Sequence, residues 1–130
     1  MNWNKSLETG VPKIDAQHKE LFVQADKLLD RTQAARVPET LEFLKTYVAN
    51  HFAAEEALQK VTAYPKADFH RKLHVDFTAT FKKLYEEYKA SGEKLMVVLN
   101  INKLVIDWLK DHIMIHDKEF ANYYLKKMGK

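Results

Sequence analysis

Residues 41–58 read LEFLKTYVANHFAAEEAL, and this stretch indicates how the chain folds. One row of its residues recurs at alternating intervals of three and four, which is the spacing of the buried face of a helix in a bundle. The row consists of Leu41, Leu44, Val48, His51, Glu55 and Leu58. Because it includes a histidine and a glutamate, the stretch predicts a helix whose buried face carries potential ligands.

Three other segments show rows of the same kind, and proline or glycine separates the segments. Pro12 and Pro38 suit the first turn of a helix, Tyr64-Pro65 interrupts the pattern, and Ser91-Gly92 is typical of a helix end. The predicted helices span residues 12–36, 38–62, 66–90 and 93–115. An N-terminal arm precedes the first helix, and a short C-terminal helical stub follows the fourth. Short links between long segments predict an all-α, up-down-up-down antiparallel four-helix bundle.

The length, composition and charge of the chain exclude several classes of protein and of metal site. A length of 130 residues suits a single domain covering residues 1–130, and the absence of cysteine excludes disulfides, thiolate metal sites and iron–sulfur clusters. The N-terminus shows no secretory pattern and no apolar run is long enough to span a bilayer, so we expect a cytoplasmic protein without stable membrane insertion. The net charge of +3 comes from interleaved lysines and acids, so no nucleic-acid partner is expected.

Six polar residues interrupt the apolar rows, and all four predicted helices contribute at least one. They are His18, His51, Glu55, His70, His74 and His112. A buried polar group without a partner costs about 1–3 kcal/mol, whereas a small domain is stable by only about 5–15 kcal/mol. A bound metal removes this difficulty, because neutral imidazoles and carboxylates become its ligands.

The spacing of these residues favours two metal ions over one. His51 and Glu55 are four residues apart, as are His70 and His74, so each pair projects from one face of a helix. Nitrogen and carboxylate ligands suit zinc, copper, nickel or iron, and so many ligands exceed the needs of one tetrahedral zinc. A structural metal, or a haem between two histidines, stays open at this point.

The order of these residues resembles the ligand motif of the hemerythrin family. The motif reads His18, then His51-x3-Glu55, His70-x3-His74 and His112-x4-Asp117, and it spans nearly the whole chain. The stretches around Trp3–Leu7, Thr9–Pro12 and Ile14–Lys19 resemble those of the bacterial members (bacteriohemerythrins), as do Tyr64-Pro65 and Trp108-Leu109.

This resemblance implies a cofactor and a ligand set. The cofactor would be two non-haem iron ions, Fe²⁺ or Fe³⁺, with a bridging oxo or hydroxo group. His70, His74 and His112 would bind one iron, and His18 and His51 the other. Glu55 and Asp117 would bridge the two. One coordination position would then remain open on the iron with two histidines, and dioxygen would bind there.

Residues next to the ligands are expected to form a dry oxygen pocket, and these are Leu21, Phe52, Leu109 and Ile113. For the last ligand, periodicity and resemblance disagree. A regular helix pairs His112 with His116, whereas Asp117 would lie about 140° around the helix from His112. Following the family, we predict that the fourth helix widens or breaks just after His112, and that His116 is not a ligand.

The function predicted is reversible dioxygen binding without catalysis, as an oxygen carrier, store or delivery protein that docks transiently to an oxygen-consuming enzyme. The alternatives are a di-iron oxidase or peroxide-handling enzyme, and an oxygen sensor. Ferritin-like di-iron enzymes are rich in glutamate and use Glu-x-x-His, whereas this chain offers more imidazoles than carboxylates. A sensor usually requires an output domain, which 130 residues do not provide.

Overall fold

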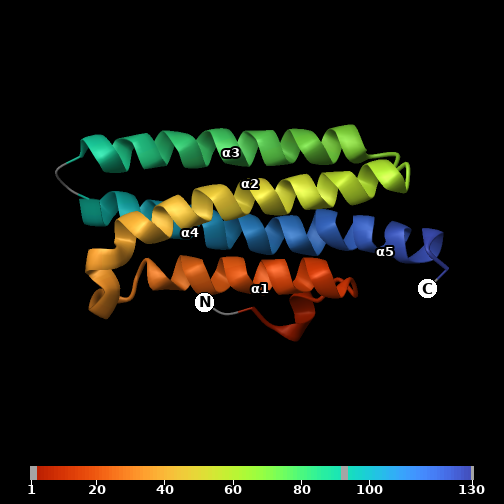
Figure 1. Ribbon diagram of the computed structural model, residues 1–130, viewed down its shortest axis with the longest axis horizontal. Helices are drawn as coiled ribbons and strands as arrows, with labels where there is room; N and C mark the ends of the chain where they lie inside the picture. Colours follow the sequence, from red (N-terminus) through yellow and green to blue (C-terminus); the bar gives the residue numbers. More distant parts are fainter. Residues whose placement is uncertain (1–2, 92–93, 130) are drawn as a thin grey trace.

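The predicted row in residues 41–58 lies along α2 (Val37–Val61), where it is buried except for Leu58, which is partly buried. The computed structural model describes residues 3–91 and 94–129, and its other long helices are α1 (Pro12–Lys27), α3 (Ala67–Ala90) and α4 (Lys94–His112). α2 lies beside α1 and α3. A π-helical segment, η3 (Ile113–Asp117), joins α4 to α5 (Lys118–Lys127), so that these three elements form one long rod. The predicted all-α antiparallel four-helix bundle is confirmed (Figure 1).

Around the bundle, α1 contacts α2 and α4, and α3 contacts the same two helices, while α5 also contacts α2. The main core runs along the bundle axis and consists of aliphatic and aromatic side chains from all four rods. Asn102 interrupts the apolar row of α4, and its Nδ2 donates a hydrogen bond of 2.7 Å to the carbonyl of Ala25 on α1. The polar group is therefore satisfied inside the contact between the two helices.

Three of the four helix predictions lie within a few residues of the observed bounds, but the first is wrong at its C-terminal end. α1 ends at Lys27, and a separate 3₁₀ helix, η2 (Arg31–Arg36), leads into α2. The Asp30 carboxylate accepts hydrogen bonds from the backbone N–H and the hydroxyl of Thr32, a local turn that competes with a continuing helix. The Ser91-Gly92 break is observed at Ser91, while Gly92 and residue 93 lie outside the described residues.

The predicted widening of the fourth helix after His112 is confirmed by η3. Its hydrogen bonds run from residue i+5 to residue i, as in the bond from the Lys118 N–H to the Ile113 carbonyl. A turn of this kind holds more residues than an α-helical turn. It therefore brings residue 117 to the face that residue 112 occupies, which a regular helix would not do.

The N-terminal arm is fastened to the start of α1 by one buried carboxylate. Asp15 accepts hydrogen bonds from the Thr9 N–H at 2.8 Å, from the Thr9 hydroxyl at 2.7 Å and from the Gly10 N–H at 3.3 Å. Gly10 has a φ of +91°, a conformation that favours glycine. The arm, which includes the 3₁₀ helix η1 (Lys5–Leu7), thus covers one side of the bundle next to α1.

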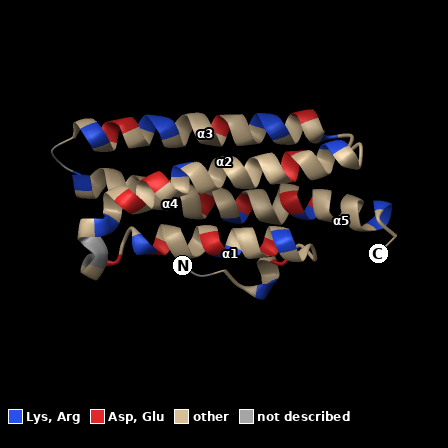
Figure 2. Cartoon of the chain, viewed as in Figure 1, with Lys and Arg blue, Asp and Glu red and all other residues tan. Residues whose placement is uncertain are grey.

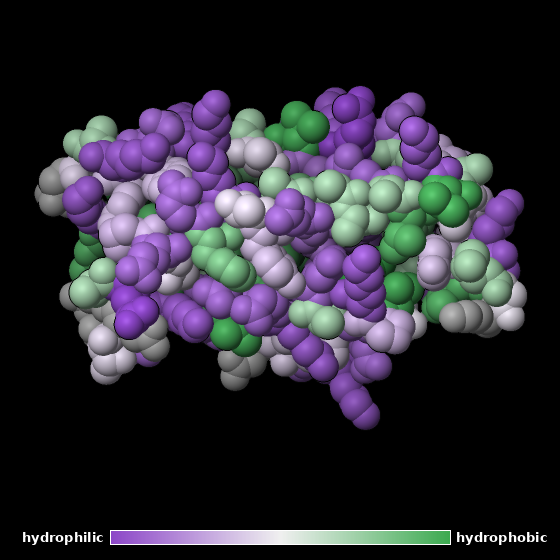
Figure 3. All heavy atoms as spheres, in the orientation of Figure 1, coloured by the Kyte–Doolittle hydropathy of each residue, from purple (hydrophilic) through white to green (hydrophobic). Residues whose placement is uncertain are grey.

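Charges of both signs are distributed over α1, α2, α3 and α4 (Figure 2). The face shown in Figure 3 is mostly hydrophilic, with several separate hydrophobic patches. Within the described residues, the helices are all too short or too polar to cross a bilayer. The bundle therefore presents the mixed surface that the interleaved sequence predicted.

Candidate metal centre

Seven ionisable side chains meet inside the half of the bundle nearer the turn between α2 and α3. Each is at most 4% exposed. They come from all four rods: His18 from α1, His51 and Glu55 from α2, His70 and His74 from α3, His112 from α4 and Asp117 from η3. Every residue of the predicted ligand set therefore lies in one cluster.

The cluster divides into two groups that share their carboxylates. One potential ligand atom from each member of a group lies within 4.8 Å of those of the other members. The first group contains Glu55, His70, His74, His112 and Asp117, and the second contains His18, His51, Glu55 and Asp117. Three imidazoles thus surround one point, two surround the other, and both carboxylates belong to both groups.

Glu55 directs its two oxygens toward different groups. Its Oε1 lies 2.8 Å from His70 Nε2 and 3.2 Å from His74 Nε2, whereas its Oε2 lies 3.9 Å from His51 Nε2. A carboxylate that offers one oxygen to each of two points can bridge two cations.

Asp117 has the same arrangement from the opposite rod. Its Oδ1 lies 3.0 Å from both His70 Nε2 and His112 Nε2, and its Oδ2 lies 3.0 Å from His18 Nε2. The π-helical turn of η3 brings this carboxylate inward, and it is 1% exposed.

The residues present fit a pair of metal ions, because several of these buried atoms have no hydrogen-bond partner among the described residues. The orphaned atoms include His18 Nε2, His74 Nε2 and all four carboxylate oxygens. The Nε2 atoms of His70 and His112 lie 2.9 Å apart. As metal ligands, both atoms would direct their lone pairs at the same cation. Two divalent cations would satisfy these atoms and offset two buried negative charges.

Burial and neighbouring groups shift the pKa of several members of the cluster. Burial lowers the pKa of His51 to about 4, which keeps its imidazole neutral. Burial also lowers the pKa of His70, but contacts with Asp117 and Glu55 outweigh this effect and raise it to about 9. Burial raises the pKa of Asp117, yet His112, His18 and His70 bring it well below its usual range. The carboxylates are therefore ionised at neutral pH.

Two residues that sequence reasoning missed orient the imidazoles from outside the cluster. Gln17 Oε1 lies 2.6 Å from His51 Nδ1, and Glu56 Oε2 lies 2.9 Å from His74 Nδ1. Both oxygens accept a hydrogen bond, so each Nδ1 carries the proton and each Nε2 presents its lone pair to the cluster. Both residues directly adjoin a predicted ligand in the sequence, and apart from that adjacency nothing in the apolar pattern points to them.

Aromatic rings stack on the imidazoles from the core side. Phe52 is parallel to His74 at 3.8 Å between ring centroids, and Trp108 is stacked on His112 at 4.1 Å. The four residues expected to form an oxygen pocket, Leu21, Phe52, Leu109 and Ile113, are all buried in the main core. The part of the core next to His74 and His112 is therefore aromatic and apolar.

His116 lies outside both groups of potential ligands. It is partly exposed, and its ring contacts those of Phe69 at 5.7 Å and His112 at 5.4 Å. Burial lowers its pKa, with further lowering by His112 and His70. The expectation that Asp117 rather than His116 faces the cluster therefore agrees with the geometry.

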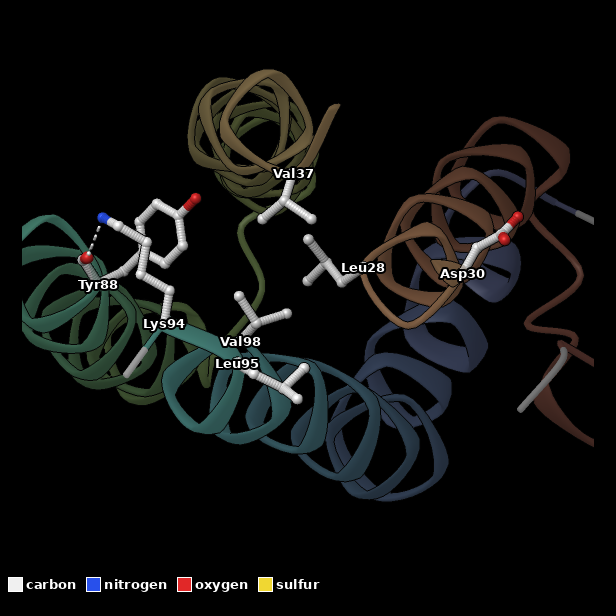
Figure 4. Close-up of a pocket in the computed structure, with 7 residues that line it drawn as sticks. All are labelled: Leu28, Asp30, Val37, Tyr88, Lys94, Leu95 and Val98. Carbon is white, nitrogen blue, oxygen red and sulfur yellow. Dashed lines mark hydrogen bonds between the residues drawn. The ribbon is translucent and has the colours of Figure 1, made fainter. Parts of the chain in front are cut away.

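A cavity of about 250 Å³ lies at the opposite end of the bundle (Figure 4). Its lining combines apolar side chains such as Leu28, Val37 and Val98 with the polar residues Asp30 and Lys94. The Lys94 amine donates a hydrogen bond of 3.0 Å to the Tyr88 carbonyl, and Asp30 points away from the valine and leucine side chains. This lining does not offer the set of ligands found in the cluster.

Comparison with known proteins agrees with this geometry. The family profile of the hemerythrin HHE cation binding domain matches residues 9–124. A myohemerythrin of Theromyzon tessulatum is 33% identical over 111 residues, which cover 85% of this chain and 82% of that protein.

Bacterial and other animal proteins are similar over comparable lengths. A bacteriohemerythrin of Pseudomonas aeruginosa (strain LESB58) is 29% identical over 123 residues, covering 92% of this chain and 78% of that protein. A hemerythrin of Sipunculus nudus is 29% identical over 118 residues, covering 91% of this chain and 88% of that protein. The match to the family profile extends across the four rods that contribute to the cluster.

Proposed function

The chain belongs to the hemerythrin family, and from this premise we propose that its non-haem di-iron centre binds dioxygen reversibly, as a carrier or store rather than as an enzyme. The observation that carries this proposal is the division of the cluster into a three-imidazole and a two-imidazole group with both carboxylates shared. This asymmetry leaves the two-imidazole side with fewer protein ligands, and a small molecule can bind there.

The proposed ligands follow from the two groups. His70, His74 and His112 would hold one iron, His18 and His51 the other, and Glu55 and Asp117 would bridge them. The split of each carboxylate's oxygens between the groups, at the distances given above, supports this assignment. When bound, the two irons would supply the two electrons that dioxygen accepts.

The surrounding residues favour binding over turnover. The outer partners Gln17 and Glu56 fix the tautomers of His51 and His74, so the imidazoles present lone pairs rather than protons to the site. The buried side chains Leu21, Leu109 and Ile113 exclude water, and a dry site disfavours the release of a charged, reduced oxygen species. Five imidazoles and two carboxylates also provide less negative charge than a glutamate-rich site for stabilising highly oxidised iron.

Oxygen cycling under controlled gas tests this proposal. The iron-loaded, reduced protein should change its visible spectrum on exposure to air and recover under argon over several cycles, with about two irons per chain and no haem absorption. Under air it should consume almost no reductant. Steady consumption of reductant with oxygen would support an oxidase instead, and a spectrum that never reverses would contradict reversible binding.

A further inference from the structure

Gln59 carries a buried amide and is not among the proposed iron ligands. Binding of two irons would therefore not give this amide a partner. Its side chain is 1% exposed, and neither Nε2 nor Oε1 has a hydrogen-bond partner among the described residues. Its own backbone carbonyl accepts a hydrogen bond of 2.9 Å from the Tyr64 N–H, so its position at the end of α2 is fixed. Because an unpaired buried amide is costly, Gln59 requires a polar partner of another kind.

His18 has a complementary requirement. Its Nε2 faces Asp117, whereas its outer nitrogen, Nδ1, is buried and has no partner among the described residues. The corresponding nitrogens of His51 and His74 are bonded to Gln17 and Glu56. With a metal on Nε2, Nδ1 of His18 becomes a hydrogen-bond donor that still needs an acceptor.

The two unsatisfied groups lie on neighbouring helices. The rings of His18 and His51 are 4.8 Å apart across the contact between α1 and α2, and Gln59 lies two i, i+4 steps beyond His51 on the same face. Helical side chains lean toward the N-terminus of their own helix. Because α1 and α2 are antiparallel, this tendency directs His18 toward the C-terminal end of α2 and Gln59 back toward Glu55.

We propose that one internal water joins His18 to Gln59 and that Gln59 is thereby a positioning residue of the di-iron centre. The Nδ1–H of His18 donates to the water, and the water donates to Gln59 Oε1. Buried waters commonly satisfy polar groups of this kind. The inference rests on the ligand assignment proposed above.

Substitution of the amide separates this role from simple core packing. Gln59→Met keeps the approximate shape but removes both polar atoms, so iron should pass to a competing chelator about 10–100-fold faster than from the wild type. The iron-shifted, exchangeable imidazole N–H resonance of His18 should also move. Gln59→Glu keeps an acceptor oxygen for the water, so the His18 resonance should stay close to its wild-type position.

Gln24→Met is the matched control, because Gln24 is a buried amide on α1 whose Nε2 donates to Glu20 at 2.7 Å, away from the cluster. It should leave iron retention and the His18 resonance unchanged. The inference is overturned if Gln59→Met retains iron as the wild type does while its iron-free form becomes more stable.

A second measurement does not depend on the folding of any variant. In a high-resolution crystal structure of the iron-loaded wild type, we expect a water within hydrogen-bond distance of both His18 Nδ1 and Gln59 Oε1, and a dry gap between them would overturn the inference. A wild type that binds no iron pair would instead refute the proposed function itself, so the two failures are distinguishable.

Discussion

Among single residues, Glu56 offers the most direct test of how the imidazoles are oriented. Its carboxylate accepts a hydrogen bond from His74 Nδ1 at 2.9 Å. We expect Glu56→Ala to speed iron loss to a chelator about 10–100-fold, because His74 loses its outer partner. Glu56→Gln, which keeps an acceptor oxygen, should lose much less. Exposed Glu39, paired with Arg36 at 3.7 Å, supplies the control Glu39→Ala, which should have no effect.

The raised pKa of His70 predicts that metal binding releases protons. In the iron-free protein this group has a pKa of about 9, above its ordinary value of 6.5, so between these values the folded form holds a proton that the unfolded form lacks. The proton therefore stabilises the iron-free fold below pH 6.5, and this contribution is lost as the pH rises through 9. Ferrous iron added at pH 7.5 should displace it, because a ligand imidazole must be neutral.

Calorimetry in buffers of different ionisation enthalpy measures this release. About one proton from His70 should appear at pH 7.5, and the number should fall as the pH rises above 9. The lowered pKa of His51, about 4, gives the opposite pH dependence of stability. Its neutral form stabilises the fold above pH 6.5, and this contribution is lost as the pH falls through 4. A release that does not vary between pH 7.5 and 10 would contradict the account of His70.

The ligand candidates could be read from the sequence because each histidine occupies an apolar row where an imidazole is costly. The roles of Gln17 and Glu56 could not be read from the sequence. A polar residue next to a ligand gives the same sequence pattern whether its side chain contacts an imidazole of the neighbouring helix or solvent. Gln59 shares the row of His51 and Glu55, but without the structure an amide at a helix end does not reveal that it is buried without a partner.

Among the elements, η3 determines whether the fourth rod can contribute both His112 and Asp117. Removing one residue from a turn with i+5 hydrogen bonds should restore a regular helix with Asp117 four positions after His112. We therefore expect deletion of Ile115, which is 61% exposed, to preserve helicity and the binding of two irons. Iron content and circular dichroism provide the measurement.

Deletion of exposed Lys103, in the regular part of α4, is the control for this prediction. It rotates every later residue by about 100° relative to the bundle, so His112 and Asp117 should leave the cluster and iron binding should fail. If deletion of Ile115 abolished iron binding as completely, the π-helical turn would not be the feature that aligns Asp117.

The turn between α2 and α3 contains a residue in the left-handed region, Ala63, with a φ of +52°. Hydrogen bonds from Tyr64 N–H to the Gln59 carbonyl and from Ala63 N–H to the Lys60 carbonyl form a glycine-type helix end. Ala63→Gly should therefore raise the free energy of unfolding by about 0.5–1 kcal/mol.

Denaturant titration checks this value, and Ala79→Gly is the matched control. Ala79 is an exposed residue inside α3, where glycine should cost about 1 kcal/mol. If both substitutions destabilised the protein equally, the left-handed conformation of Ala63 would not carry strain.

Element types were more predictable than element ends. The rows of α2, α3 and α4 specify helices because their apolar spacing is sustained. The irregular turn after His112 could be predicted because His112 and Asp117 both had to face the metal centre. The end of α1 was missed because the Asp30–Thr32 turn is a local hydrogen-bonding choice, and the surrounding polar residues of 31–36 are also compatible with a helix.

For the whole molecule, stability is expected to depend on the metal. The iron-free bundle buries two ionised carboxylates and several imidazole nitrogens without hydrogen-bond partners, and a ligand that binds only the folded form raises its stability. Removal of iron should therefore lower the Tm by at least several degrees, as followed by circular dichroism with and without chelator. Equal melting temperatures for the two forms would contradict this dependence.

The most direct test of the central claim is anomalous X-ray diffraction from crystals of the iron-loaded protein at the iron absorption edge. The account predicts two iron peaks inside the bundle, with three imidazoles on one, those of His18 and His51 on the other, and Glu55 and Asp117 between them. A single peak, no peak, or an iron bound by His116 with Asp117 turned to solvent would contradict it.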